Sequence, residues 1–291
     1  MGNRLIDSLP FASAEGNSQA DSRLKMAAER AFGTQFGSFT RISTGNSSLN
    51  FNVVEHNGRR HLVKFFTGIA NPRIEMLSQV TGNLVPKISL GKGSFPIGND
   101  WHVCALEWRN GESIDPANMT QPQISSLYNA YKELCQALKN TICPAADSAL
   151  SSYGASLTPC PIHGDMHFKN VFFEGDKATS FLDLEKIRIG LPTEDLLRYF
   201  IHAAERTRFW RLRRKSAIKR NFARLVQISE YPTAAWIAAL DLYERRKMER
   251  RARKARSRIA FAIDCFMRSG LYGSFRQIIA KDDRGSGLKA D

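Results

Sequence analysis

The hydrophobic and polar positions in the first hundred residues change their period along the chain. Residues 21–33 place Leu and Ala at helical spacing, whereas residues 49–54 and 60–66 are short apolar-rich runs. The dipeptide Asn57-Gly58 separates these two runs and is typical of a tight turn between antiparallel strands. Asn71 and Pro72 indicate the start of a second helix, and residues 101–108 form another strand-like run. The pattern predicts a small antiparallel sheet with helices beside it.

The pattern becomes mainly helical after the glycine-containing turn at residues 109–111, apart from a short strand–loop–strand stretch between residues 162 and 187. We therefore expect an α+β, two-lobed protein: a loose tail at 1–19, a sheet-rich lobe at 20–110 and a larger helical lobe at 111–291. No apolar run approaches the roughly eighteen residues of a membrane span. The absence of an apolar leader and of any C-x-x-C pair favours a cytoplasmic protein.

The strongest chemical signal lies in the polar residues of that short stretch. His163-Gly164-Asp165 is followed by Asn170, and Asp183 comes at the end of the next apolar run. A kinase needs a carboxylate that accepts the proton of a hydroxyl, together with oxygen ligands for magnesium. The spacing matches the kinase pattern D-x-x-x-x-N followed by a metal-binding Asp. These residues therefore indicate phosphoryl transfer.

On residues 163–170 and on Asp183-Leu184-Glu185, the chain resembles the aminoglycoside phosphotransferase and choline kinase family, which has a protein-kinase-like fold. The resemblance extends over roughly residues 20–205. It implies that Asp165 is the catalytic base, that Asn170 and Asp183 bind Mg²⁺, and that ATP is the donor. It also implies that Asp195 braces the catalytic loop, while Glu185 is either a second metal ligand or part of the loop structure.

The same resemblance implies nucleotide contacts in the front lobe. Lys64, at the end of a strand, would reach the α- and β-phosphates, and Glu75 on the following helix would hold its ammonium group. A loop over the phosphates and a hinge at the adenine complete the expected contacts. Their residues would be Gly45, Asn46 and Ser47 in the loop, and Glu107 and Trp108 in the hinge.

The positive charge of the chain is concentrated in one segment. The whole sequence has a formal net charge of +14, and residues 205–258 alone contain 18 Lys and Arg against 5 Asp and Glu. A requirement for solubility alone would spread this charge, so a local anionic partner is worth considering. The alternatives are a solvated helical face with its aromatic residues packed inward, an anionic membrane surface bound through residues 206–258, an anionic acceptor, and nucleic acid, which we consider unlikely.

Together these features predict an ATP- and Mg²⁺-dependent phosphotransferase that acts on a hydroxyl of a small molecule or saccharide. The basic helical lobe would repel a cationic aminoglycoside, so we expect an anionic acceptor. A kinase for lipopolysaccharide sugars, peripheral at the inner face of the membrane, is the first alternative. A kinase-like module that binds nucleotide without chemistry, and a nucleic-acid binder acting through the basic helices, are the others.

Overall fold

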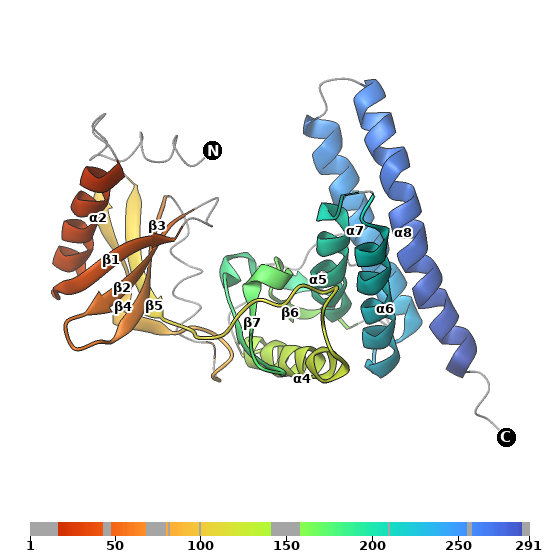
Figure 1. The fold of residues 1–291 in the computed structure, drawn as a ribbon, viewed down its shortest axis with the longest axis horizontal. Coiled ribbons are helices and arrows are strands. Elements are labelled where there is room, and N and C mark those ends of the chain that lie inside the picture. Colours follow the sequence, from red (N-terminus) through yellow and green to blue (C-terminus); the bar gives the residue numbers. More distant parts are fainter. Residues whose placement is uncertain are drawn as a thin grey trace. The chain divides into compact units, whose positions relative to one another are not determined.

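The computed structural model describes residues 17–42, 48–67, 80, 82–98, 100–140, 158–208, 210–254 and 258–286. Contacts along the chain divide it into two compact units, Met1–Asn110 and Gly111–Asp291. The first unit is built on an antiparallel sheet and the second is mainly helical (Figure 1). The predicted α+β fold class is confirmed.

The first unit consists of one helix and a five-stranded sheet whose neighbouring strands are all antiparallel, in the order β1-β2-β3-β5-β4. Helix α2 packs on β1 and β4. The bounds of these elements are α2 Asn17–Phe32, β1 Phe36–Ile42, β2 Leu49–Glu55, β3 Arg60–Thr67, β4 Ile88–Gly98 and β5 Trp101–Glu107.

The predicted hairpin is confirmed, because β2 and β3 pair around a turn in which Gly58 has a φ of 86°. Alternation along β2 buries its apolar side chains, and Phe51 lies 4.3 Å, centroid to centroid, from the ring of Phe39. Helix α2 begins at Asn17, four residues earlier than predicted, because its first turn carries polar residues rather than the apolar period. The helix predicted near Asn71 lies outside the described residues.

Strand β4 is not apparent from the sequence. It contains Gly91, Gly93 and Pro96, residues that normally indicate a turn, and its pairing with β5 shifts register at three points. Because β4 is an edge strand with a bulged ladder, it tolerates both the glycines and the proline.

The second unit places two short antiparallel ribbons, β6-β9 and β7-β8, beside a group of helices (Figure 1). Helix α4 packs on β8 and α6, and α5 packs on α6 and α7. The bounds are α4 Gln121–Leu138, β6 Cys160–Ile162, η2 Phe168–Asn170, β7 Val171–Glu174, β8 Lys177–Phe181, η3 Leu184–Lys186, β9 Arg188–Gly190, α5 Pro192–Arg206, α6 Leu212–Ile228, α7 Thr233–Lys254 and α8 Arg258–Ser286.

The basic segment forms α6, α7 and the start of α8. Its aromatic residues Phe222, Trp236 and Tyr243 are buried, as expected for helices whose aromatic side chains pack inward, whereas Trp210 is 59% exposed. Part of its charge is used within the molecule, since Arg214 pairs with Asp115 at 2.8 Å. The segment therefore contributes to the core of the unit as well as to its surface.

Candidate active site

The polar loop identified in the sequence connects β6 to β7 and is held at both ends by the two ribbons. His163 is buried; its Nε2 lies 2.7 Å from the carbonyl oxygen of Leu182, and its Nδ1 lies 3.3 Å from the backbone nitrogen of Asp165. A ring that donates from Nε2 and accepts at Nδ1 is a neutral imidazole with its proton on Nε2. His163 therefore ties the start of the loop to the segment that precedes Asp183.

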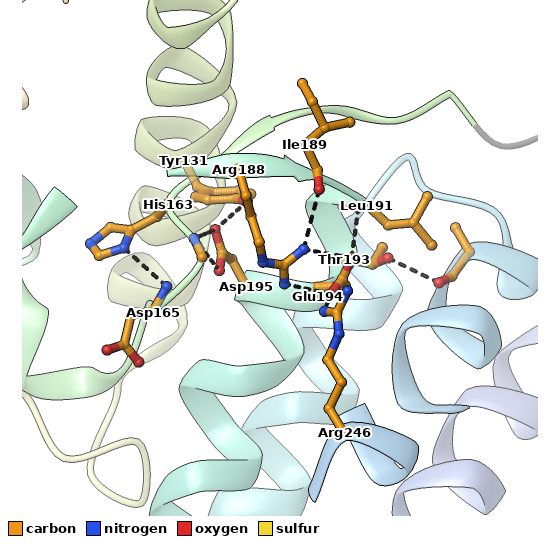
Figure 2. Close-up of polar contacts among 12 residues, drawn as sticks. Tyr131, His163, Asp165, Arg188, Ile189, Leu191, Thr193, Glu194, Asp195 and Arg246 are labelled. Carbon is orange, nitrogen blue, oxygen red and sulfur yellow. Dashed lines mark hydrogen bonds and ion pairs between the residues drawn. The ribbon is translucent and has the colours of Figure 1, made fainter. Parts of the chain in front are cut away.

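Gly164 and Asp195 form the second attachment of the loop. The backbone N–H of Gly164 donates to Oδ1 and Oδ2 of Asp195 at 3.1 and 3.2 Å, and the Tyr131 hydroxyl donates to Oδ2 at 3.0 Å (Figure 2). Gly164 has a φ of 78°, and a Cβ there would lie 2.0 Å from the backbone oxygen of Lys186. Only glycine fits this turn, and Asp195 braces it from the first turn of α5.

The carboxylate of Asp165 is buried between two cations. Lys186 pairs with Oδ2, and Arg198 pairs with Oδ1. Burial alone would raise the pKa of Asp165, but the Arg198 guanidinium and the Lys186 ammonium outweigh it and hold that pKa below its usual range. Asp165 is therefore a carboxylate at neutral pH, able to accept a hydrogen bond.

Asn170 is the last residue of this loop, and Asp183 lies in the segment that follows β8. The Asn170 amide nitrogen donates to the backbone oxygen of Asp165 at 3.2 Å, so its Oδ1 is the atom suited to a cation. The backbone N–H of Leu182 donates to the Asn170 carbonyl at 2.8 Å. Asp183 follows directly, with a left-handed φ of 63° and an exposed side chain. The structure thus brings the segments of Asp165, Asn170 and Asp183 together.

The donor set suits a magnesium ion shared with a substrate. Among the residues that the structure describes, no three His, Cys, Asp or Glu side chains form a preformed metal centre. Mg²⁺ usually takes only one or two carboxylates from the protein, keeps several waters and binds substrate phosphates. One amide oxygen from Asn170 and one carboxylate from Asp183 fit that pattern.

His167 lies next to His202, and its ring also interacts electrostatically with Asp165. The two rings stack with their centroids 5.0 Å apart, and the Nδ1 atom of each is buried without a hydrogen-bond partner among the described residues. Burial lowers the pKa of each imidazole from 6.5 to about 4. Both rings are neutral at physiological pH, and the stack supports the loop from α5.

Lys64 belongs to the first unit, on β3 between the buried side chains of Val63 and Phe65. It is only 5% exposed, so it is not a solvated strand end, and it has an interaction partner. Lysine is rarely buried to this degree unless it is paired. Four of the other predicted nucleotide contacts, Gly45, Asn46, Ser47 and Glu75, lie outside the described residues.

Glu107 is the last residue of β5 in the first unit, and Trp108 follows it directly. The Glu107 N–H donates to the Lys87 carbonyl at 2.8 Å, and its carboxylate accepts from Arg109 at 2.8 Å. Arg60 lies over the Trp108 ring at 4.3 Å. An adenine at this hinge would therefore have to bind the remaining backbone groups and not the Glu107 N–H.

Sequence reasoning missed Lys186 and Arg198, the two cations at Asp165. A signal for Arg198 exists, because it follows Asp195 by three positions and such residues share one face of a helix. Asp195 binds Gly164 and Arg198 binds Asp165, so one face of α5 holds two consecutive loop residues. No comparable spacing indicates Lys186, which reaches Asp165 from η3 through the fold of the β8–β9 connection.

Comparison with known proteins agrees with this geometry. Residues 133–237, which contain Asp165, Asn170, Asp183 and Asp195, match the family described as "Phosphotransferase enzyme family". No curated protein matches the chain by sequence.

Solved structures with the same fold cover most of the chain. The amicoumacin kinase hAmiN, in complex with AMP-PNP, Ca²⁺ and Ami, is 12% identical with a TM-score of 0.54, covering 91% of this chain and 93% of its own. A thermostable mutant of the aminoglycoside phosphotransferase APH(4)-Ia, with AMP-PNP and hygromycin B, is 11% identical with a TM-score of 0.53, covering 92% and 100%. The macrolide 2'-phosphotransferase MphH from Brachybacterium faecium is 13% identical with a TM-score of 0.51, covering 77% and 89%. The two-lobed fold and the family resemblance predicted from the motifs are confirmed.

Proposed function

We propose that this chain, with the fold of the phosphotransferase enzymes and their motif residues in place, is an ATP- and Mg²⁺-dependent kinase for a hydroxyl of a small molecule or saccharide. The observation that supports this most directly is the Asp165 loop, in which Asp165 has a buried, ionised carboxylate and its backbone oxygen accepts from the Asn170 amide. Relatives with the same fold bind AMP-PNP, one of them with Ca²⁺.

Each polar residue of the loop has a distinct part in this proposal. Asp165 orients the acceptor hydroxyl and takes its proton, and Asn170 and Asp183 hold Mg²⁺. When bound, the ion neutralises charge on the phosphates of ATP. His163 and Asp195 touch no reacting atom and act as positioning residues, because they fix the backbone on either side of Gly164. Catalysis of this kind depends mainly on placement and electrostatics.

The nucleotide contacts of the proposal lie in the first unit. Lys64 would bind the α- and β-phosphates with Glu75 as its partner, and Gly45, Asn46 and Ser47 would cover them. The burial of Lys64 supports this assignment, since a buried ammonium on a sheet is suited to a phosphate partner. Trp108 and the backbone next to Glu107 would contact the adenine.

The acceptor of the proposed reaction is anionic, on the evidence of charge. The ion pairs that join this segment to carboxylates outside it, Arg214 with Asp115 and Arg246 with Glu194, offset only part of the net +13 of residues 205–258. A lipopolysaccharide sugar or another lipid-linked saccharide at the inner membrane face is the more specific candidate, with residues 206–258 against anionic lipid. Among the described residues, no helix is both long and apolar enough to cross a bilayer. Co-sedimentation with anionic and neutral vesicles tests this membrane contact.

The experiment for the core proposal is transfer from γ-labelled ATP, with Mg²⁺, to pools of sugars, sugar phosphates and lipid-linked saccharides. Asp165→Ala should abolish transfer while retaining nucleotide binding. Asp176→Asn, an exposed change on the β7–β8 turn, is the matched control and should behave as the unmodified protein. Unchanged turnover in Asp165→Ala would reject the assignment.

The same experiment separates the alternatives from the kinase. Nucleotide binding with no transfer to any pool would favour a binding module. Affinity for DNA or RNA that falls steeply with salt and does not depend on Asp165 would favour a nucleic-acid binder.

A further inference from the structure

A cavity of about 240 Å³ lies within the second unit, between the catalytic loop and helices α5 and α7. Gly164 and Asp195 form one side of it, so it adjoins the residue that precedes Asp165. Drug-sized ligands occupy pockets of roughly 300–1,000 Å³. This cavity therefore suits a smaller group, such as a phosphate with part of a sugar ring.

The lining of this cavity is strongly basic. Five of its side chains are cationic, against the two carboxylates of Glu194 and Asp195; the cations are Arg188, Arg198, Arg246, Lys247 and Arg250. Both carboxylates are already engaged. Asp195 accepts from Gly164 and Tyr131, and Glu194 accepts from the Leu191 N–H at 3.0 Å and pairs with Arg188 and Arg246 (Figure 2). Asp165 pairs with Arg198 and Glu205 pairs with Lys247, so the cations around the cavity share a smaller number of carboxylates. The lining therefore carries more positive than negative charge.

Lys247 shows how closely these cations are packed. Burial lowers the pKa of Lys247, its ion pair with Glu205 at 2.7 Å opposes that effect, and Arg198 and Arg251 lower the pKa further. Glu205 offsets only part of the repulsion from these neighbouring like charges, and a further anion would stabilise them. Arginine forks and a lysine ammonium are also the side chains that recognise phosphate most effectively.

Arg198 contacts both the cavity and the proposed catalytic base, Asp165. It lines the cavity and at the same time pairs with Oδ1 of Asp165. An anion that binds Arg198 competes with Asp165 for the guanidinium. Loss of that pair would leave Oδ1 able to accept a hydrogen bond from an acceptor hydroxyl.

We propose that this cavity binds a phosphate group of the acceptor, so that the substrate is a saccharide already carrying a phosphate; the inference rests on the proposed function. The acceptor hydroxyl oxygen forms a bond to the γ-phosphorus of ATP, and the bond from that phosphorus to the β-γ bridging oxygen breaks. ADP leaves with the electron pair, and the hydroxyl proton passes to Asp165. The acceptor phosphate remains bound to the arginines and holds the hydroxyl in place.

The first test measures binding of inorganic phosphate to the full chain by titration calorimetry, with AMP-PNP and Mg²⁺ present. Arg250→Gln should raise the dissociation constant roughly tenfold, because it removes one charge-assisted contact. Arg253→Gln, an exposed change on the same helix outside the cavity lining, is the matched control and should leave it unchanged. Equal effects of the two variants would overturn the cavity assignment.

The second test compares acceptors in the labelled-ATP assay. Glucosamine 1-phosphate should be preferred over glucosamine, and Arg250→Gln should raise KM for the phosphorylated sugar while kcat changes little. The same assay is repeated with lipid A in neutral vesicles as the acceptor. Transfer to lipid A, compared with transfer to glucosamine 1-phosphate, shows whether the acceptor is a phosphorylated glycolipid or a soluble sugar phosphate.

The failures of the two proposals are distinguishable. Equal transfer to phosphorylated and neutral sugars would overturn the phosphate cavity and keep the kinase. Phosphate binding that depends on Arg250, with no transfer to any acceptor, would keep the anion site and overturn the kinase.

Discussion

The backbone N–H of Gly164 donates to both carboxylate oxygens of Asp195, at 3.1 and 3.2 Å. This contact joins the catalytic loop to the first turn of α5, across 31 positions of sequence. Arg198, one turn further along α5, pairs with Asp165. The position of Asp165 is therefore determined by α5 as well as by the loop itself.

Substitution of Gly164 should disrupt this arrangement more than an ordinary glycine change. In Gly164→Ala the new Cβ meets the backbone oxygen of Lys186, which cannot move independently, so we expect a loss of about 3 kcal/mol in the free energy of unfolding and loss of transfer activity. Gly175→Ala is the control, with a φ of 60° but open space around it, and should cost about 1 kcal/mol. Urea denaturation measures both, and equal losses would contradict the steric argument.

Glu205 should be a major contributor to the packing of α5, α7 and α8. It is 5% exposed, accepts from Tyr243 and Tyr272 at 3.0 and 2.6 Å, and pairs with Lys247. Glu205→Gln leaves a half-buried ammonium without its anion, so we expect a loss of about 3 kcal/mol in the free energy of unfolding.

The control for that change is Glu230→Gln. Glu230 pairs with Lys132 but is 74% exposed, so its loss should leave the free energy of unfolding almost unchanged. Chemical denaturation of the two variants compares them directly, and similar costs would show that Glu205 is not a packing centre.

The free energy of unfolding should fall as the pH is lowered through the range in which His167 and His202 take up protons only in the unfolded chain. Their imidazoles remain neutral in the folded protein down to about pH 4, whereas in the unfolded chain they take a proton near pH 6.5. The unfolded state therefore binds more protons between these values, and the free energy of unfolding falls as the pH falls from 6.5 to about 4. Asp165 and Glu205, whose pKa values are held below their usual 3.8 and 4.5, add to this loss at the acid end of the window and below it, where the unfolded chain takes up their protons.

His202→Gln should weaken this pH dependence, because glutamine takes no proton. His56→Gln, at an exposed position in the β2–β3 turn, should leave it unchanged. Melting temperatures recorded across pH 4–7 test both, and an unaltered slope in His202→Gln would contradict the assignment.

The pH dependence of phosphoryl transfer should reveal how far the neighbouring cations lower the pKa of Asp165. In Lys186→Met one of the two positive charges is removed, so the pKa of Asp165 rises and the acid limb of kcat/KM moves to higher pH. Lys177→Met, an exposed change on β8, should leave the limb in place. A lower rate with an unmoved acid limb would show that Lys186 does not set the ionisation of Asp165.

The sequence identifies the elements whose signals are local. The Asn57-Gly58 hairpin, the strand at Trp101 and the loop from His163 to Asn170 all follow from turn residues and alternating apolar runs. Strand β4 does not, because its glycines and proline indicate a turn and only its pairing with β5 makes it a strand.

The residue types that suggest phosphoryl transfer, and their spacing, are likewise properties of the sequence alone, because a loop motif keeps its residues close together. Tertiary structure decides the surroundings of that motif. Lys186 and Arg198 reach Asp165, and five cations line one cavity, only because η3, α5 and α7 come together in the fold. A charge count along the chain measures how much positive charge there is, but the direction in which each guanidinium points depends on packing between helices far apart in sequence.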